Sequence, residues 1–171
     1  MSITALSRPA GPAWWVARLL AAHRWALLHA QALAKKLSRK RPLPAHLQVG
    51  IRGEFEALFF LRRQGFTIAE RRWRSPELNG DLDLIAWEGD GNRQTLCFIE
   101  VKTRTARDMT PAALAVDAAK RRMLQQMAAS YLRSLPQRYR EGLLVRFDIV
   151  SVYLLGEKVE CELVRDAFER R

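Results

Sequence analysis

Two neighbouring stretches of the sequence hold the side chains that could do chemistry, GDLDLIAW at residues 80–87 and CFIEVKTR at residues 97–104. Side chains alternate between the two faces of a β-strand, so Glu100 and Lys102 share one face of the second stretch. If the two stretches pair as a hairpin, Asp83 converges with them on one surface. Two carboxylates and an ammonium group are costly to bury unpaired, and carboxylate oxygens are the ligands that Mg²⁺ prefers. Such a cluster has the side chains that a Mg²⁺ site needs, with most of the remaining positions left to water and phosphate.

The same alternation divides the neighbouring residues between an apolar and a polar face. Asp81 is expected on the face of Asp83, with Leu82 and Leu84 packed on the other. The residues expected to point away from Glu100 are Cys97, Ile99 and Val101. An alternative interpretation of Glu100 and Lys102 is ion pairing between strands on a solvated face.

Other residue types exclude other chemistries. The two cysteines, Cys97 and Cys161, are far apart and lack metal-ligand spacing, which is typical of reduced thiols in the cytosol. The three histidines, His23, His29 and His46, lie in the N-terminal segment or at its junction with the body. A histidine-based nuclease or hydrolase therefore has no histidine in the body, and catalysis there must use carboxylates and lysine.

Apolar spacing and turn signals predict the elements that position these residues. We expect one helix over residues 53–64 and a second over residues 117–133, capped by Asp117. Expected strands cover residues 66–73, 81–87, 96–104 and 146–155, with a short strand or helix from Val159. This order predicts a mixed α/β domain over residues 47–171.

Charge divides the chain into two parts. The protein has 29 Lys and Arg against 18 Asp and Glu, a net charge of +11. Residues 1–45 hold eight of the basic residues and no acidic one, which leaves +3 for the remainder. We expect residues 1–46 to form a basic amphipathic helical arm, helical over Pro12–Leu37, that ends in the linker SRKRPLPAHLQ. Such a charge indicates an anionic partner, either nucleic acid or a membrane surface.

Several segments, in this order, resemble a known protein family: GEFEALFFLRRQGF, GDLDLIA, FIEVKTR, RFDIVSV and a final DAF. A helical glutamate followed by an aspartate and an E-x-K pair is similar to the PD-(D/E)XK core shared by restriction endonucleases and archaeal Holliday-junction resolvases. The whole series more closely resembles the YraN-type family of small bacterial proteins. The resemblance covers about residues 50–169 and implies a restriction-endonuclease-like mixed sheet flanked by helices. Asp81 departs from the pattern, because that family usually has the longer glutamate there.

The resemblance also implies roles for individual residues. The catalytic positions are taken by Glu54, Asp83, Glu100 and Lys102. Asp83 and Glu100 would hold the cation, while Lys102 would orient or help deprotonate the attacking water and offset charge on the phosphate. Glu54 would hold a second metal position or orient metal-bound water. An alternative interpretation is that Glu54 lies near a helix N-terminus, where the helix dipole stabilises a negative charge. Candidate nucleic-acid contacts are Arg74, Arg104 and Lys120.

Three functions remain as hypotheses from the sequence. The resemblance implies a metal-dependent nucleic-acid phosphodiesterase, specifically a DNA endonuclease with structure-dependent recognition. The second hypothesis is a nucleic-acid-binding protein of the same fold that does not cleave, and the third is a membrane-peripheral protein whose arm binds anionic lipid. Asp83, Glu100 and Lys102 favour the first, because a pure binder does not need them. The expected partner is nucleic acid, DNA before RNA; a homodimer and membrane contact are further candidates. The expected location is the bacterial cytoplasm.

Overall fold

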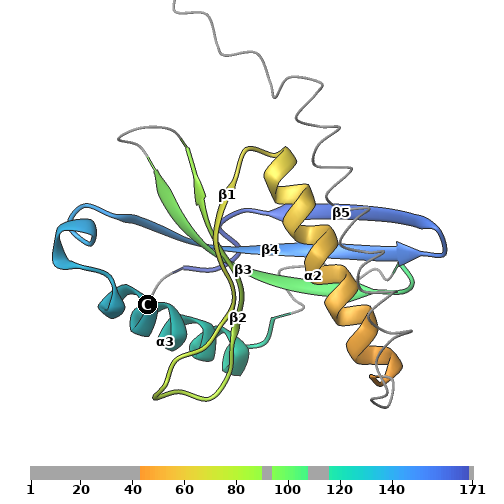
Figure 1. Cartoon of the computed structure of the whole chain (residues 1–171), viewed down its shortest axis with the longest axis horizontal. Helices are drawn as coiled ribbons and strands as arrows, with labels where there is room; N and C mark the ends of the chain where they lie inside the picture. Colours follow the sequence, from red (N-terminus) through yellow and green to blue (C-terminus); the bar gives the residue numbers. More distant parts are fainter. Residues whose placement is uncertain (1–42, 90–93, 108–115, 170–171) are drawn as a thin grey trace, which may run out of the picture. The chain divides into compact units, whose positions relative to one another are not determined.

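The computed structural model describes residues 43–89, 94–107 and 116–169, so the predicted helix over Pro12–Leu37 lies outside the described residues. Its elements are α2 (Ala45–Arg63), β1 (Thr67–Trp73), β2 (Leu82–Glu88), β3 (Thr95–Arg104), α3 (Ala118–Ser134), a 3-10 turn (Gln137–Tyr139), β4 (Leu144–Leu155) and β5 (Lys158–Val164) (Figure 1). The predicted order of helices and strands is confirmed, and the segment after Val159 is a strand.

The strands form one mixed sheet in the order β1-β2-β3-β4-β5. Strands β3 and β4 are parallel and are connected through α3, while every other neighbouring pair is antiparallel. A parallel pair needs a long crossover connection, which explains why α3 lies between β3 and β4 in the sequence. The predicted mixed α/β class and the predicted hairpin of β2 with β3 are both confirmed.

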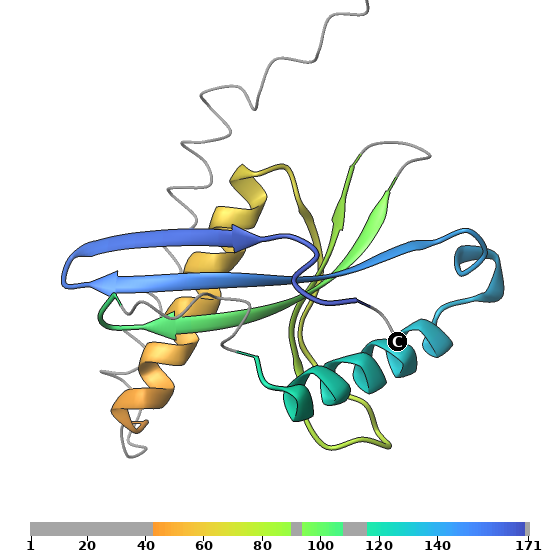
Figure 2. The same ribbon diagram turned by 180° about the vertical axis from the view of Figure 1, so that it is seen from behind.

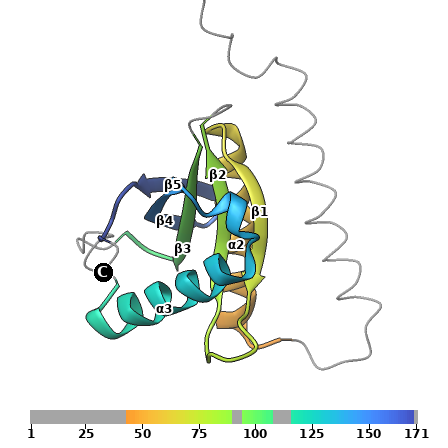
Figure 3. The ribbon, with the colours of Figure 1, turned by 90° about the vertical axis from the view of Figure 1, so that its left-hand side faces the viewer.

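The two helices cover opposite faces of the sheet, as the views from the two sides and from the edge show (Figures 1, 2 and 3). The core on the α2 side includes Phe59, Leu84, Cys97, Ile99 and Val150. The core on the α3 side includes Ile85, Phe98, Met127, Phe147 and Ile149. Adjacent residues in β2, β3 and β4 thus alternate between two cores, and these central strands are buried on both faces.

Helix α2 begins eight residues earlier than expected. Pro44 is its N-cap, and Ala45 is its first residue, so the end of the predicted linker is helical. The added turns are held by Val49 and Ile51, which pack against the core on the α2 side. The linker prediction is therefore wrong from Ala45 onward, and His46 belongs to the folded domain.

The strict alternation predicted for the start of β2 is also wrong. Leu84 packs in the core on the α2 side, whereas Leu82 packs in the core on the α3 side. Backbone pairing between β2 and β3 begins only at Leu84, opposite Ile99. Residues before Leu84 are therefore not held in register by β3, and Asp83 lies where the two strands separate.

A glycine sets the distance between α2 and β3. A Cβ atom added to Gly53 would lie 1.8 Å from Thr103 Oγ1, which is far inside van der Waals contact. Only glycine allows the helix to approach the strand this closely. Because Glu54 is the next residue, this approach brings the Glu54 carboxylate to the end of the β2–β3 hairpin.

Candidate active site

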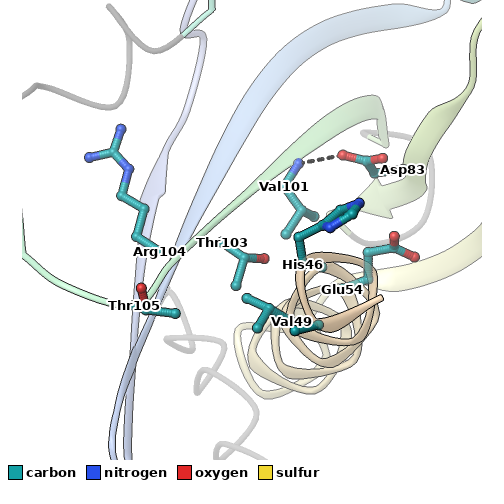
Figure 4. Close-up of a pocket in the computed structure, with 10 residues that line it drawn as sticks. His46, Val49, Glu54, Asp83, Val101, Thr103, Arg104 and Thr105 are labelled. Carbon is teal, nitrogen blue, oxygen red and sulfur yellow. Dashed lines mark hydrogen bonds between the residues drawn. The ribbon is translucent and has the colours of Figure 1, made fainter. Parts of the chain in front are cut away.

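Asp83 bridges the separated ends of β2 and β3. Its Oδ2 accepts a hydrogen bond of 2.8 Å from the Val101 backbone N–H (Figure 4). The carboxylate thus replaces the backbone acceptor that continued pairing with β2 would supply. Burial first and the nearby Glu100 carboxylate second raise the pKa of Asp83 to about 7, against the lowering effects of the Val101 hydrogen bond and Lys120. Asp83 therefore lies in a site that favours a cation.

Glu100 is almost fully buried, at 4% exposure, and its two oxygens have different surroundings. Lys102 Nζ donates to Oε1 at 2.9 Å, and Lys120 Nζ lies 3.1 Å from the same oxygen. Oε2 is buried and has no hydrogen-bond partner. A buried carboxylate oxygen without a partner costs free energy unless a cation or donor satisfies it.

Glu54 reaches the same region from α2. Its Oε2 lies 3.8 Å from Arg71 Nη2 and 3.7 Å from Arg72 Nε, both longer than a hydrogen bond. This oxygen is buried without a hydrogen-bond partner. Burial raises the pKa of Glu54, although the two arginines lower it. Glu54 also contributes to the raised pKa of Asp83, so the two carboxylates interact.

Arg71 and Arg72 reach one carboxylate because β1 is irregular. Consecutive strand residues normally point to opposite faces. In β1 the register shifts between Ile68 and Glu70, and Arg72 has a positive φ of 47°, in the left-handed region. These irregularities turn both arginine side chains toward Glu54, which no regular spacing in the sequence indicated.

The structure places Asp83 near Glu100, and Glu100 contacts both Lys102 and Lys120. Lys120 was expected to contact nucleic acid. Its Nζ contacts Glu100 because the Asp117 side chain caps α3, accepting from the Lys120 N–H at 2.7 Å, and the first turn of α3 lies beside β3. No sequence pattern indicated this contact, since it depends on how α3 packs.

The other two candidate nucleic-acid contacts lie outside this cluster. Arg74 has 71% of its side chain exposed, and its Nη2 lies 3.8 Å from Asp81 Oδ2. Arg104 lines a pocket beside the cluster. Their contact with nucleic acid stays a prediction.

The cluster contains two carboxylates that could bind a metal ion, Asp83 and Glu100. Within residues 43–89, 94–107 and 116–169, no group of three or more His, Cys, Asp and Glu side chains is arranged to hold one. Mg²⁺ usually takes one or two protein carboxylates and fills its other positions with water and phosphate oxygens. Asp83 and Glu100 fit that pattern, and the unpartnered Glu100 Oε2 is an available ligand atom.

A pocket of about 550 Å³ opens beside the Glu54 and Asp83 carboxylates, between α2 and β3 (Figure 4). It is lined by Ala45, His46, Val49, Gly50, Glu54, Asp83, Val101, Thr103, Arg104 and Thr105. The expectation that no histidine serves the body is therefore wrong, because the early start of α2 carries His46 to this pocket. Pro44 could have indicated this, since proline is common at helix starts.

The cysteines take no part in the cluster. Cys97 and Cys161 are both reduced cysteines, and Cys97 is buried in the core on the α2 side. Burial raises the pKa of the Cys97 thiol to about 12. Cys97 therefore contributes packing and does not act as a nucleophile.

The fold and the cluster define a class: a mixed α/β protein with a carboxylate–lysine site at the separated end of a hairpin. The uncharacterised protein family UPF0102 matches residues 53–152. A UPF0102 protein of Koribacter versatilis is 47% identical over 125 residues, 73% of this chain and 82% of the relative. A second, of Solibacter usitatus, is 40% identical over 135 residues, covering 79% and 94% of the two chains. The chain belongs to the UPF0102 family, which confirms the resemblance to the YraN-type proteins.

The predicted arm lies before the matched segment, since the family match begins at residue 53. In the part of the chain that the structure describes, no helix has the length and apolar character needed to cross a membrane.

Proposed function

We propose that this protein is a divalent-metal-dependent nucleic-acid phosphodiesterase of restriction-endonuclease-like, PD-(D/E)XK fold, which cleaves DNA according to its structure. The observation that carries the proposal is the buried, unpartnered Glu100 Oε2 beside Asp83. The charge of Glu100 raises the pKa of Asp83, so the two carboxylates lie close enough for electrostatic repulsion. A divalent cation would satisfy the free oxygen and relieve this repulsion.

Asp83 and Glu100 would hold the cation, with the Val101 carbonyl as a further ligand. When bound, Mg²⁺ or Mn²⁺ would supply Lewis-acid stabilisation of the phosphate oxygens. The Val101 N–H keeps one Asp83 oxygen in place, and the two lysines keep one Glu100 oxygen in place. The chain therefore fixes the orientation of both carboxylates, which leaves their remaining oxygens for the ligand.

Lys102 is the residue of the cluster that we assign to the reacting groups. Its ammonium group, 2.9 Å from Glu100 Oε1, is a hydrogen-bond donor for the attacking water and for a phosphate oxygen. In hydrolysis the water oxygen bonds to phosphorus, the bond from phosphorus to the leaving sugar oxygen breaks, and a water proton reaches that oxygen through solvent. Lys120 contributes a second positive charge, which offsets the charge that develops on the phosphate.

A binding protein without cleavage is the second candidate, and a specific observation favours it. Arg71 and Arg72 lie beside Glu54 and so offset its charge, and Asp81, shorter than the usual glutamate, lies near Arg74. Only two carboxylates then remain for a metal. A phosphodiesterase should cleave DNA when Mg²⁺ or Mn²⁺ is added, whereas a binding protein should bind DNA without cleaving it.

A titration with Mg²⁺ and with Mn²⁺ on branched, single-stranded and duplex DNA tests the proposal, with RNA of the same sequence as comparison. Asp83→Asn should abolish cleavage and retain folding, because it removes a ligand charge at nearly constant volume. Lys102→Ala should slow cleavage far more than it weakens binding. Glu77→Gln, at an exposed carboxylate in the loop before β2, is the matched control. Binding without cleavage in either metal would support the second candidate. Wild-type cleavage rates in both variants would mean that the nuclease is a contaminant or uses another site.

A further inference from the structure

The pocket between α2 and β3 extends well beyond the carboxylates. Glu54 and Asp83 lie on one side of it and Arg104 and Thr105 on the other, with Val49 and Thr103 between them (Figure 4). His46 is eight residues before Glu54 on the same helix, which corresponds to about 12 Å along its axis. The pocket, which Asp83 lines and Glu100 does not, therefore extends well away from the carboxylates assigned to the metal.

The lining of this pocket is mixed in a way that suits a nucleotide. Val49 and Val101 supply apolar walls, His46 supplies an aromatic ring, and the Thr103 and Thr105 hydroxyls supply hydrogen-bonding groups. Proteins that bind unstacked bases place them against aromatic or apolar side chains, histidine included, and contact the sugar and phosphate with polar groups.

The size of the pocket limits what can enter it. A volume of about 550 Å³ lies in the range of pockets that hold one small molecule. A single nucleotide fits that range, whereas a paired duplex, whose major groove alone is about 12 Å wide, does not. An occupant joined to a phosphate in the carboxylate cluster must therefore be one unpaired residue of a strand.

We infer that this pocket binds one unstacked nucleotide of the substrate strand, adjacent to the cleaved phosphate, with its base against His46 and Val49. The inference rests on the proposed function for the position of that phosphate. It makes unpaired nucleotides the feature that the protein recognises: single strands, overhangs or the strands at a branch. A blunt, fully paired duplex lacks this feature.

Gly50 allows the pocket to be filled without disturbing the core. It lines the pocket from inside α2, and a Cβ atom added there meets nothing within 4 Å. Glycine is also a poor residue for a helix interior, so Gly50→Ala and Gly50→Phe should not lower the melting temperature. Gly50→Phe places a ring in the pocket, and Gly50→Ala, which adds only a methyl group, is its matched control.

The test is the affinity of the full chain for fluorescein-labelled oligonucleotides in EDTA, which prevents cleavage. Gly50→Phe should weaken binding of a single-stranded oligonucleotide at least tenfold relative to Gly50→Ala, and should change binding of a blunt duplex less than twofold. His46→Ala should weaken single-strand binding about tenfold, and His46→Phe should restore it, since stacking needs a ring and not a charge. Equal single-strand affinities for Gly50→Phe and Gly50→Ala would overturn the inference, as would equal losses on both DNA forms.

The Asp83 and Gly50 variants test the phosphodiesterase activity and the nucleotide pocket separately. If the wild type cleaves DNA and the Asp83→Asn variant does not, the phosphodiesterase stands whatever the Gly50 variants do. If no metal gives cleavage but Gly50→Phe still loses single-strand binding, the pocket stands and the protein is a binder of unpaired nucleic acid.

Discussion

Replacing Asp83 with asparagine should stabilise the metal-free protein at neutral and alkaline pH. The pKa of Asp83 is raised from 3.8 to about 7, because the carboxylate is buried and lies near Glu100. Between these two values the folded state binds more protons than the unfolded chain, so the stability of the wild type falls as the pH rises through this interval. Asparagine keeps an oxygen that can accept from the Val101 N–H but carries no charge. The stability of the Asp83→Asn variant should therefore not fall with pH in this interval.

The size of the effect follows from the pKa shift. A shift of about 3 pKa units corresponds to about 4 kcal/mol, which is the largest gain expected for Asp83→Asn at pH 8 relative to pH 4. Urea unfolding at pH 4, 6 and 8 in EDTA measures it, with Glu77→Gln as the control at an exposed carboxylate. If the stability difference between Asp83→Asn and the wild type were the same at pH 4 and pH 8, Asp83 would not be buried beside the Glu100 charge, and the reasoning would be refuted.

Added metal should reduce the difference in stability between the two proteins. At pH 8, Mg²⁺ at 100 times its dissociation constant would stabilise the wild type by about 2.7 kcal/mol, because it binds only the folded state. Asp83→Asn lacks one of the two ligand charges and should gain much less. Equal gains in both proteins would show that the bound metal lies elsewhere.

Three other predictions concern the fold and the basic segment. Gly53→Ala should lower the free energy of unfolding by about 1–3 kcal/mol in a urea titration, because its methyl group would overlap the Thr103 hydroxyl; no loss would show that α2 shifts freely. Asp148→Ala should lower the free energy of unfolding by about 3 kcal/mol or more, since it removes the buried carboxylate that Arg146 contacts at 2.7 and 2.8 Å. An unchanged free energy of unfolding would contradict a stabilising ion pair between Arg146 and Asp148. Deleting residues 1–42, which carry eight basic residues and no acidic one, should weaken DNA binding and flatten its dependence on salt; an unchanged salt slope would separate this segment from the DNA contact.

Residues in the middle of regular elements could be placed from the sequence. Glu100 and Lys102 follow strand alternation because both residues of β3 are paired with β4, and their contact at 2.9 Å confirms the shared face. The Asp117 cap of α3 was predicted because its signal is local: one side chain accepts from an N–H three residues later. Such short-range signals carry most of the predictable fold.

Irregular and long-range features could not be placed in this way. Arg71 and Arg72 reach the same carboxylate only through a register shift and a positive φ in β1, which periodicity does not encode. Lys120 meets Glu100 only after α3 has packed on the sheet. His46 was assigned to a linker because Pro44 marks both helix starts and irregular segments, and tertiary packing of α2 decided between them.

The hydrogen bond from Val101 to Asp83 makes one backbone amide a reporter of the whole cluster. Its proton is held by a side chain whose charge depends on pH and which, in the proposed function, would bind a metal ion beside the phosphate of the substrate. The Val101 resonance in a ¹⁵N–¹H correlation spectrum therefore combines these three signals at a single position, without an attached label. Its exchange with solvent deuterium also measures how often the end of the hairpin opens.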